Sequence, residues 1–133
     1  MARYHCPADR FTLNLSSDLR FRSYRVNWFL KGPPTDSVSK IDQVNSPANV
    51  FVFVDEKQDA IADGVFGIYR NPSTAWVNIP TARHNRSGTL SFADGHCQRL
   101  KWKAPEPKLI IGEQPVSGSQ DLEALRTLQN LLP

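Results

Sequence analysis

Hydrophobic and polar residues alternate along several short segments of the chain, which is the pattern of half-buried β-strands. Over residues 22–30 the apolar positions are Tyr24, Val26 and Trp28, and polar Ser23, Arg25 and Asn27 stand between them. We expect a strand here, with the apolar set facing the core and the polar set facing solvent. Gly32-Pro33-Pro34 ends it, because a proline cannot donate a hydrogen bond to a neighbouring strand.

The most apolar segment, Asn49–Asp55, is a nearly continuous run of valine and phenylalanine. Such a run is typical of a strand buried on both faces, so it predicts the central strand of a sheet. Ile61–Tyr69 and Ala75–Ile79 are predicted as further strands, separated by a turn signal at Asn71-Pro72-Ser73. Before the central strand, the spacing of apolar residues over Asp36–Val44 predicts a short helical turn.

Asp94-Gly95 lies between two strand-like segments, residues 89–93 and 96–103, and Asp-Gly is a strong hairpin signal. A two-residue loop would mix core residues with charged ones on one face of the hairpin. A three-residue loop with a left-handed Gly95 pairs Phe92 with His96. This pairing places the core residues on one face of the hairpin and the charged residues on the other. We therefore predict the longer loop, with Leu90, Phe92, Leu100 and Trp102 on one face and Arg99, Lys101 and Lys103 on the other.

The last part of the chain carries leucines at helical spacing. Leu122, Leu125, Leu128 and Leu132 follow Ser117-Gly118-Ser119, in which a serine can cap the helix. Leu109–Ile111 is predicted as a short final strand before it. The predicted fold is a single domain over residues 1–133 of the strand-rich α+β class. Its antiparallel sheet has about five to seven short strands, and the helix is C-terminal.

Composition narrows the classes of protein. The 133 residues carry 16 Lys+Arg and 13 Asp+Glu, a formal net charge of +3, and 40% are hydrophobic. These values are those of an ordinary globular domain and exclude the composition of a disordered chain. No apolar run reaches the length of about 18 residues that a membrane helix needs, and no secretory signal is visible. The basic residues are scattered, and Arg99, Lys101 and Lys103 are interpreted as a solvated face, so nucleic acid is not an expected partner.

One group of residues offers metal or acid–base chemistry: His84, Asp94 and His96, with Asp55 and Glu56 at the end of the central strand. Imidazole and carboxylate share transition metals, and all five stand at strand ends or in turns. The alternative is architectural. Asp94 then stabilises its own turn, His84 bonds a backbone carbonyl, and His96 packs at the end of the sheet.

The two cysteines, Cys6 and Cys97, are too few for a disulfide scaffold, and they form either one bridge or two free thiols. Cys6 precedes a proline in a predicted turn, Cys6–Asp9, without the helix terminus that activates a thiol. The chain also lacks a Gly-x-Ser-x-Gly elbow and a phosphate-binding glycine loop. No catalysis is therefore expected.

Several of these segments together resemble one family. His84, followed after nine residues by Asp94-Gly95, resembles the signature of the prepilin-type H-x9-DG proteins. Cys6–Asp9 is similar to that family's Cys-Pro-Ser-Asp turn, and Ser23–Asn27 to its Ser-Tyr-x-x-Asn strand. Ser46–Glu56 is similar to its Pro-Ser…Asp-Glu segment. The order and rough spacing agree over residues 3–103.

The resemblance implies a bacterial pilin-like or pseudopilin-like head, of the kind found in type II secretion, with a structural role. Such heads are carried on an N-terminal hydrophobic helix that a prepilin peptidase processes, and that helix is absent from these residues. The implied location is extracytoplasmic, in the periplasm or at the cell surface. The implied partners are other pilin-like subunits or secretion-assembly proteins, with membrane contact only through the helix.

Within the resemblance, His84, Asp94, Gly95 and His96 have architectural roles, and no cofactor is expected. An oxidising compartment is compatible with a disulfide between Cys6 and Cys97. The alternative function is a metal-binding or metal-dependent hydrolytic domain. It would hold a divalent metal ion on His84, Asp94 and His96, with Glu56 as the base.

Overall fold

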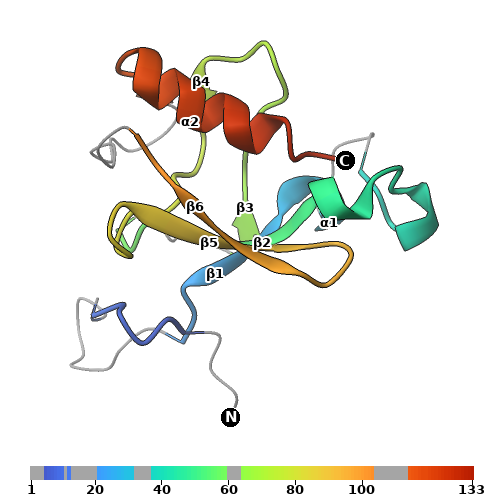
Figure 1. Ribbon diagram of the computed structural model, residues 1–133, viewed down its shortest axis with the longest axis horizontal. Helices are drawn as coiled ribbons and strands as arrows, with labels where there is room; N and C mark the ends of the chain where they lie inside the picture. The colour runs from blue at the N-terminus through green and yellow to red at the C-terminus, as the bar shows by residue number, and fades with distance from the viewer. Residues whose placement is uncertain (1–4, 11, 13–20, 32–36, 60–63, 104–113) are drawn as a thin grey trace.

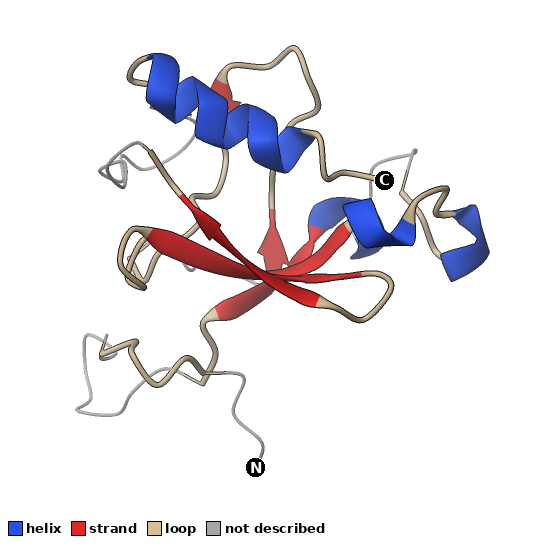
Figure 2. Ribbon diagram, viewed as in Figure 1, coloured by secondary structure: helices blue, strands red, loops and turns tan. Residues whose placement is uncertain are grey.

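The computed structural model describes residues 5–10, 12, 21–31, 37–59, 64–103 and 114–133. In this part of the chain one five-stranded sheet lies below the C-terminal helix (Figures 1 and 2). The strands of the sheet, in spatial order, are β3 (Val65–Phe66), β1 (Tyr24–Asn27), β2 (Phe51–Asp55), β5 (Ser87–Phe92) and β6 (Cys97–Lys101). All neighbours are antiparallel except β1 and β3. The strand-rich α+β class is confirmed.

The remaining elements are short, apart from the last helix. They are α1 (Trp28–Lys31), two 3-10 turns at Ile41–Gln43 and Pro47–Asn49, a two-stranded sheet of β4 (Ala75–Trp76) and β7 (Gln114–Pro115), and α2 (Ser119–Gln129). None of the helices in the described ranges has the length and apolar character needed to cross a membrane.

The apolar run does form the central strand, β2, between β1 and β5. It is not buried on both faces, however, because the side chain of Phe53 is 43% exposed. The pairing with β5 shifts register between Phe51 and Phe53, while Phe51 and Val54 are fully buried. One face of β2 therefore belongs to the core, and the other is only partly covered.

The hairpin of β5 and β6 has the predicted three-residue loop. The Phe92 amide donates to the His96 carbonyl at 2.9 Å, the Gly95 amide donates to the Phe92 carbonyl at 3.0 Å, and Gly95 has φ +94°. Leu90, Phe92 and Trp102 are buried in the core, whereas Arg99, Lys101 and Lys103 are exposed. Burial of one face and charge on the other thus selected the loop length.

Gly95→Ala is expected to lower the free energy of unfolding by about 1 kcal/mol, because alanine resists the left-handed conformation. A methyl group at this position meets nothing within 4 Å, so the cost comes from the backbone alone. Urea denaturation measures the change. Gly95→Asn is the matched control and should cost less, since asparagine tolerates this region. An alanine variant as stable as the parent would contradict the prediction.

Helix α2 covers one face of the sheet, as Figure 1 shows. Leu125 and Leu128 are fully buried and belong to the same hydrophobic cluster as Leu90, Phe92 and Trp102. The predicted leucine stripe is therefore a core element, although Leu122 and Leu132 are only partly buried.

The predicted serine cap of α2 is wrong. Gly118 occupies the N-cap position without a side-chain hydrogen bond. Asp121 serves instead, since its Oδ2 accepts a hydrogen bond from the Ser117 amide at 2.7 Å. A carboxylate in the first turn accepts from a backbone donor and also places a negative charge at the positive end of the helix dipole, which a neutral serine hydroxyl does not.

The orientation predicted for β1 is also wrong. Its polar residues Ser23, Arg25 and Asn27 are buried, whereas Tyr24, Val26 and Trp28 are half-buried. Alternation separates the two faces of a strand but does not say which face is inside. The polar face is inside because each of its members has a partner there. The Nε of Arg25, for example, lies 2.5 Å from the Glu56 carboxylate.

Several predicted elements are shorter than expected. The strand predicted to reach Leu30 ends at Asn27, whose Oδ1 accepts a hydrogen bond from the Phe29 amide at 3.0 Å and so begins α1. Among the described residues, 64–69 contribute β3, 75–79 contribute β4, and 37–44 contribute the first 3-10 turn. Predicted features at residues 32–34 and 109–111 lie outside the described residues.

Candidate functional site

The described N-terminal segment lies on the side of the sheet away from α2 (Figure 1), and a cluster of polar side chains contacts it. Asp55 ends β2 and follows Val54, so their side chains point to opposite faces. Val54 belongs to the core, and Asp55 faces the N-terminal segment. Both are fully buried.

The turn at Cys6–Asp9 brings a thiol to this cluster. The Asp9 amide donates to the Cys6 carbonyl at 2.9 Å, which closes the predicted turn. The Cys6 amide donates to Ser23 Oγ at 3.0 Å, and that hydroxyl donates to Asp9 Oδ2 at 2.7 Å. The turn is thereby fastened to the residue just before β1, and Cys6 is buried.

Three side chains meet at the centre of the cluster. His84 Nε2 lies 3.1 Å from Cys6 Sγ and 3.1 Å from Asp55 Oδ2. The second oxygen of Asp55, Oδ1, accepts a hydrogen bond from Arg83 at 2.7 Å. Arg83 also forms an ion pair with Asp9 at 3.0 Å. One guanidinium thus links two buried carboxylates, and the Oδ2 atom of Asp55 is directed to the histidine.

A tight reversal of the chain positions His84. The Arg86 amide donates to the Ala82 carbonyl at 2.9 Å, and Asn85 and Arg86 have φ of 53° and 60°. Two consecutive residues in the left-handed region turn the chain sharply just before β5 begins. This places the imidazole against the end of β2, where Asp55 lies.

The electrostatics of the cluster follow from burial. Burial raises the pKa of Asp55 above its usual value, and the charge of Arg83 and the hydrogen bond to His84 partly offset that rise. Tyr24 lies opposite Asp55 in the pairing of β1 with β2. Burial, together with Asp55 and Cys6, raises the pKa of Tyr24 to about 12. Its hydroxyl therefore stays protonated beside the thiol at neutral pH.

The geometry decides which chemistry the cluster can support. A nucleophile–histidine–carboxylate triad uses one ring nitrogen for the nucleophile and the other for the carboxylate. Here the same nitrogen, Nε2, faces both Cys6 and Asp55. The arrangement is therefore not that of such a triad. Instead, sulfur, nitrogen and oxygen atoms converge on one point, as ligands of a metal ion do.

The structure does not bring together the four residues of the predicted metal site. His84 lies before β5, and Asp94 and His96 lie in the loop after it, so six strand residues separate them. At a rise of about 3.3 Å per residue this is roughly 20 Å. Glu56 is engaged elsewhere, with Arg25 and with the side-chain amide of Asn78 at 2.8 Å.

At the hairpin loop, Asp94 and His96 contact each other. Asp94 Oδ1 accepts a hydrogen bond from the His96 amide at 3.1 Å and lies 2.6 Å from the His96 ring. These hydrogen bonds lower the pKa of Asp94. The His96 ring stacks on Phe92 with 4.2 Å between ring centroids. The arrangement is that of the architectural interpretation for these two residues. His84 differs, because its partners are side chains rather than a backbone carbonyl.

The structure contradicts the disulfide between Cys6 and Cys97, since both are free thiols. Cys6 is buried beside His84, whereas Cys97 is exposed at the start of β6 and pairs with Ser91. The two thiols therefore belong to opposite ends of β5. The fold separates the two thiols in space, and the number of cysteines in the sequence does not show whether they are close enough to form a disulfide.

Sequence reasoning missed four contributors to the cluster, namely Asp9, Ser23, Tyr24 and Arg83. Arg83 is held by two buried carboxylate partners, Asp9 and Asp55, and its side chain is only 11% exposed. Ser23 was assigned to solvent. The useful signal was the set of short segments that carry the family resemblance, because each of them contributes a residue here.

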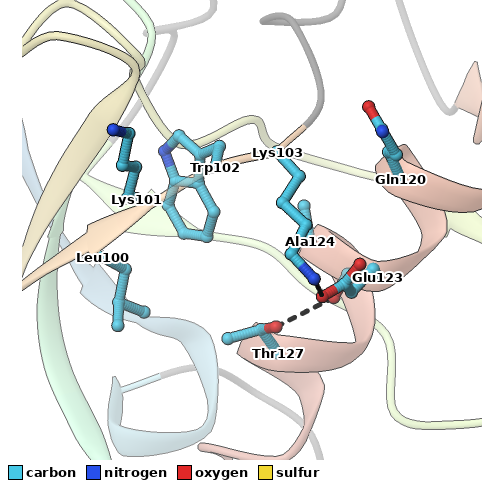
Figure 3. Close-up of a pocket in the computed structure, with 8 residues that line it drawn as sticks. All are labelled: Leu100, Lys101, Trp102, Lys103, Gln120, Glu123, Ala124 and Thr127. Atoms are coloured by element: carbon cyan, nitrogen blue, oxygen red, sulfur yellow. Dashed lines mark hydrogen bonds and ion pairs between the residues drawn. The ribbon is translucent and has the colours of Figure 1, made fainter.

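A small hollow lies between β6 and α2 (Figure 3). Its volume is about 80 Å³, and it is lined by Leu100, Lys101, Trp102, Lys103, Gln120, Glu123, Ala124 and Thr127. An ion pair between Lys103 and Glu123, at 2.6 Å, crosses it. Sites for small-molecule ligands are typically about 300–1,000 Å³, so this hollow has room only for a few water molecules.

Comparisons of the chain with models of known families, with characterised proteins and with solved structures find no match.

Proposed function

We propose that this chain is a structural and interaction module, resembling the soluble head of a pilin-like or pseudopilin-like protein of the bacterial cell envelope. One observation carries the proposal: the four segments that resemble the prepilin-type H-x9-DG family meet at one end of the sheet. They are far apart in the sequence, so a chance set of short matches would have no reason to converge.

Each segment supplies a contact to this junction. Cys6 and Asp9 come from the first segment, and Ser23 from the second. Asp55 comes from the third, and His84 begins the H-x9-DG signature. The side-chain contacts of these segments therefore hold the N-terminal turn, β1, β2 and the start of β5 together. Residues with this role support architecture, and we propose no catalytic step for them.

The other end of the signature has the same character. Asp94 and Gly95 define the hairpin loop through a side-chain hydrogen bond and a positive φ. The signature residues thus lie at both ends of β5. His84 contacts other segments just before the strand, and Asp94 and Gly95 form the hairpin loop just after it. Such a rigid frame suits a head that presents a surface to neighbouring subunits in an extracytoplasmic assembly.

The coding sequence upstream of Met1 tests this function. We expect an in-frame prepilin-peptidase site followed by an apolar helix of about 20 residues. Fractionation of cells that express the complete coding sequence should then place the protein in the envelope, with chemical cross-links to pilin-like subunits. An in-frame stop codon directly upstream, together with recovery in the cytosolic fraction, would contradict the proposal.

A further inference from the structure

We propose that Cys6, Asp55 and His84 form a binding site for a divalent transition-metal ion of the zinc type. The proposal goes beyond the structural role above, because no part of that role requires a metal. Among the described residues, these three form the group of His, Cys and carboxylate side chains whose ligand atoms all lie within 4.8 Å of one another.

The three donors match the chemistry of zinc. Zn²⁺ binds cysteine sulfur, histidine nitrogen and carboxylate oxygen, and sites with three protein ligands keep a fourth position for water. Calcium and magnesium require oxygen ligands and do not favour a thiolate. The mixed set of sulfur, nitrogen and oxygen therefore selects against these two ions.

The two distances from the histidine nitrogen are slightly shorter than those of a tetrahedral site, and all three donor atoms lie within 4.8 Å of one another. Zinc–ligand distances of about 2.0–2.3 Å place neighbouring ligand atoms about 3.4–3.6 Å apart. In the structure His84 Nε2 is 3.1 Å from Cys6 Sγ and 3.1 Å from Asp55 Oδ2. Small side-chain adjustments of about 0.3–0.5 Å would open room for the ion between them.

The neighbours of the ligands hold them in place. Arg83 binds Asp55 Oδ1 at 2.7 Å, which leaves Oδ2 facing the proposed ion. Hydrogen bonds from the Cys6 amide to Ser23, and from Ser23 to Asp9, fix the turn that carries the thiol. Partners of this kind orient metal ligands in known sites, and their loss typically weakens metal binding by about 10–100-fold.

Carboxylate and thiolate donors favour a cation. The site includes the Asp55 carboxylate, whose Oδ2 lies 3.1 Å from His84 Nε2. Ionisation of the Cys6 thiol on metal binding adds a further negative charge. Cys6 and Asp55 are buried, whereas the His84 side chain is 28% exposed. The cluster therefore borders on solvent at His84. A bound ion would link the N-terminal turn to the end of β2.

The full chain, purified under reducing conditions and titrated with Co²⁺ in place of spectroscopically silent Zn²⁺, tests the proposal. We expect the ultraviolet absorption band of a Co²⁺–thiolate bond, saturation at one equivalent, and loss of the band when Zn²⁺ displaces Co²⁺. Cys6→Ser should abolish the band. His84→Gln should weaken Co²⁺ binding by about a hundredfold or more, since losing a ligand costs more than losing a supporting partner.

Cys97→Ser and His96→Gln are the matched controls, because each removes the same type of side chain from the opposite end of β5. Both should bind Co²⁺ as the parent does. Melting with Zn²⁺ and with a chelator adds a test that needs no variant, and Zn²⁺ should raise the Tm by several degrees. A parent chain without the Co²⁺ band or the Tm rise would overturn the proposal. So would a band that survives in Cys6→Ser or is lost in Cys97→Ser.

Discussion

Replacing Glu56 with leucine is expected to lower the free energy of unfolding by about 3–5 kcal/mol, because it leaves a buried arginine without its counter-charge. Arg25 and Glu56 are 1% and 0% exposed, and their charged atoms lie 2.5 Å apart. The second oxygen of Glu56 accepts a hydrogen bond from Asn78, which is lost as well. Leucine is similar in volume to glutamate, so little of the loss comes from a cavity. Urea denaturation gives the value.

Two further variants separate the buried charge from other effects. The double variant Arg25→Met with Glu56→Leu removes both charges and should be more stable than Glu56→Leu alone, by about 2 kcal/mol. Glu123→Leu removes one member of an exposed ion pair with Lys103. It should cost no more than about 1 kcal/mol. If the double variant were less stable than the single one, the unpaired charge would not be the cause.

Replacing Trp76 with alanine is expected to destabilise the fold by about 3–5 kcal/mol, as truncation of a buried aromatic side chain does. Trp76 is 1% exposed and belongs to the core cluster beneath α2. Its indole nitrogen also donates to Asp121 Oδ1 at 2.9 Å. The loss therefore combines a large cavity with a buried carboxylate that is deprived of a donor. Chemical denaturation, followed by circular dichroism, measures it.

Trp76→Phe divides the two contributions. The phenyl ring fills much of the space but cannot donate to Asp121, so we expect a loss of about 1–3 kcal/mol from the hydrogen bond and the smaller ring. Asp121 still binds the Ser117 amide in this variant, which keeps the start of α2 capped. A phenylalanine variant as unstable as the alanine variant would show that the hydrogen bond, rather than the cavity, dominates.

The hairpin of β5 and β6 shows that local structure can be predicted from residues that are close together in the sequence. A turn dipeptide and two alternating segments were enough to predict the loop, the pairing of Phe92 with His96 and the buried face. Each of these depends on local backbone preference and on the period of a strand. The C-terminal helix was readable for the same reason, although its cap was not, because Asp121 is fixed by a partner 45 residues away.

The first strand shows where local reasoning ends. Its alternation was read correctly, but its faces were assigned by hydrophobicity, which places Arg25 and Asn27 in solvent. The structure buries both side chains. Glu56 neutralises the charge of Arg25, and backbone groups at residues 29 and 51 form hydrogen bonds with the side chain of Asn27. A polar residue can be buried where a partner compensates for its lost water. These partners lie outside β1, so the sequence of β1 alone does not reveal them.

The proposed metal site depends even more on tertiary structure. From the sequence, His84 was grouped with Asp94 and His96 because all three stand at predicted strand ends or in turns. The fold extends β5 between them and carries Cys6, 78 residues away, to the imidazole instead. By itself the sequence determined the class of fold, the hairpin and the buried helix, because these follow from periodicities of two and about 3.6 residues. Only the packing of distant segments decided which polar side chains are buried and which donor atoms meet, because burial and contact are properties of the whole assembled chain.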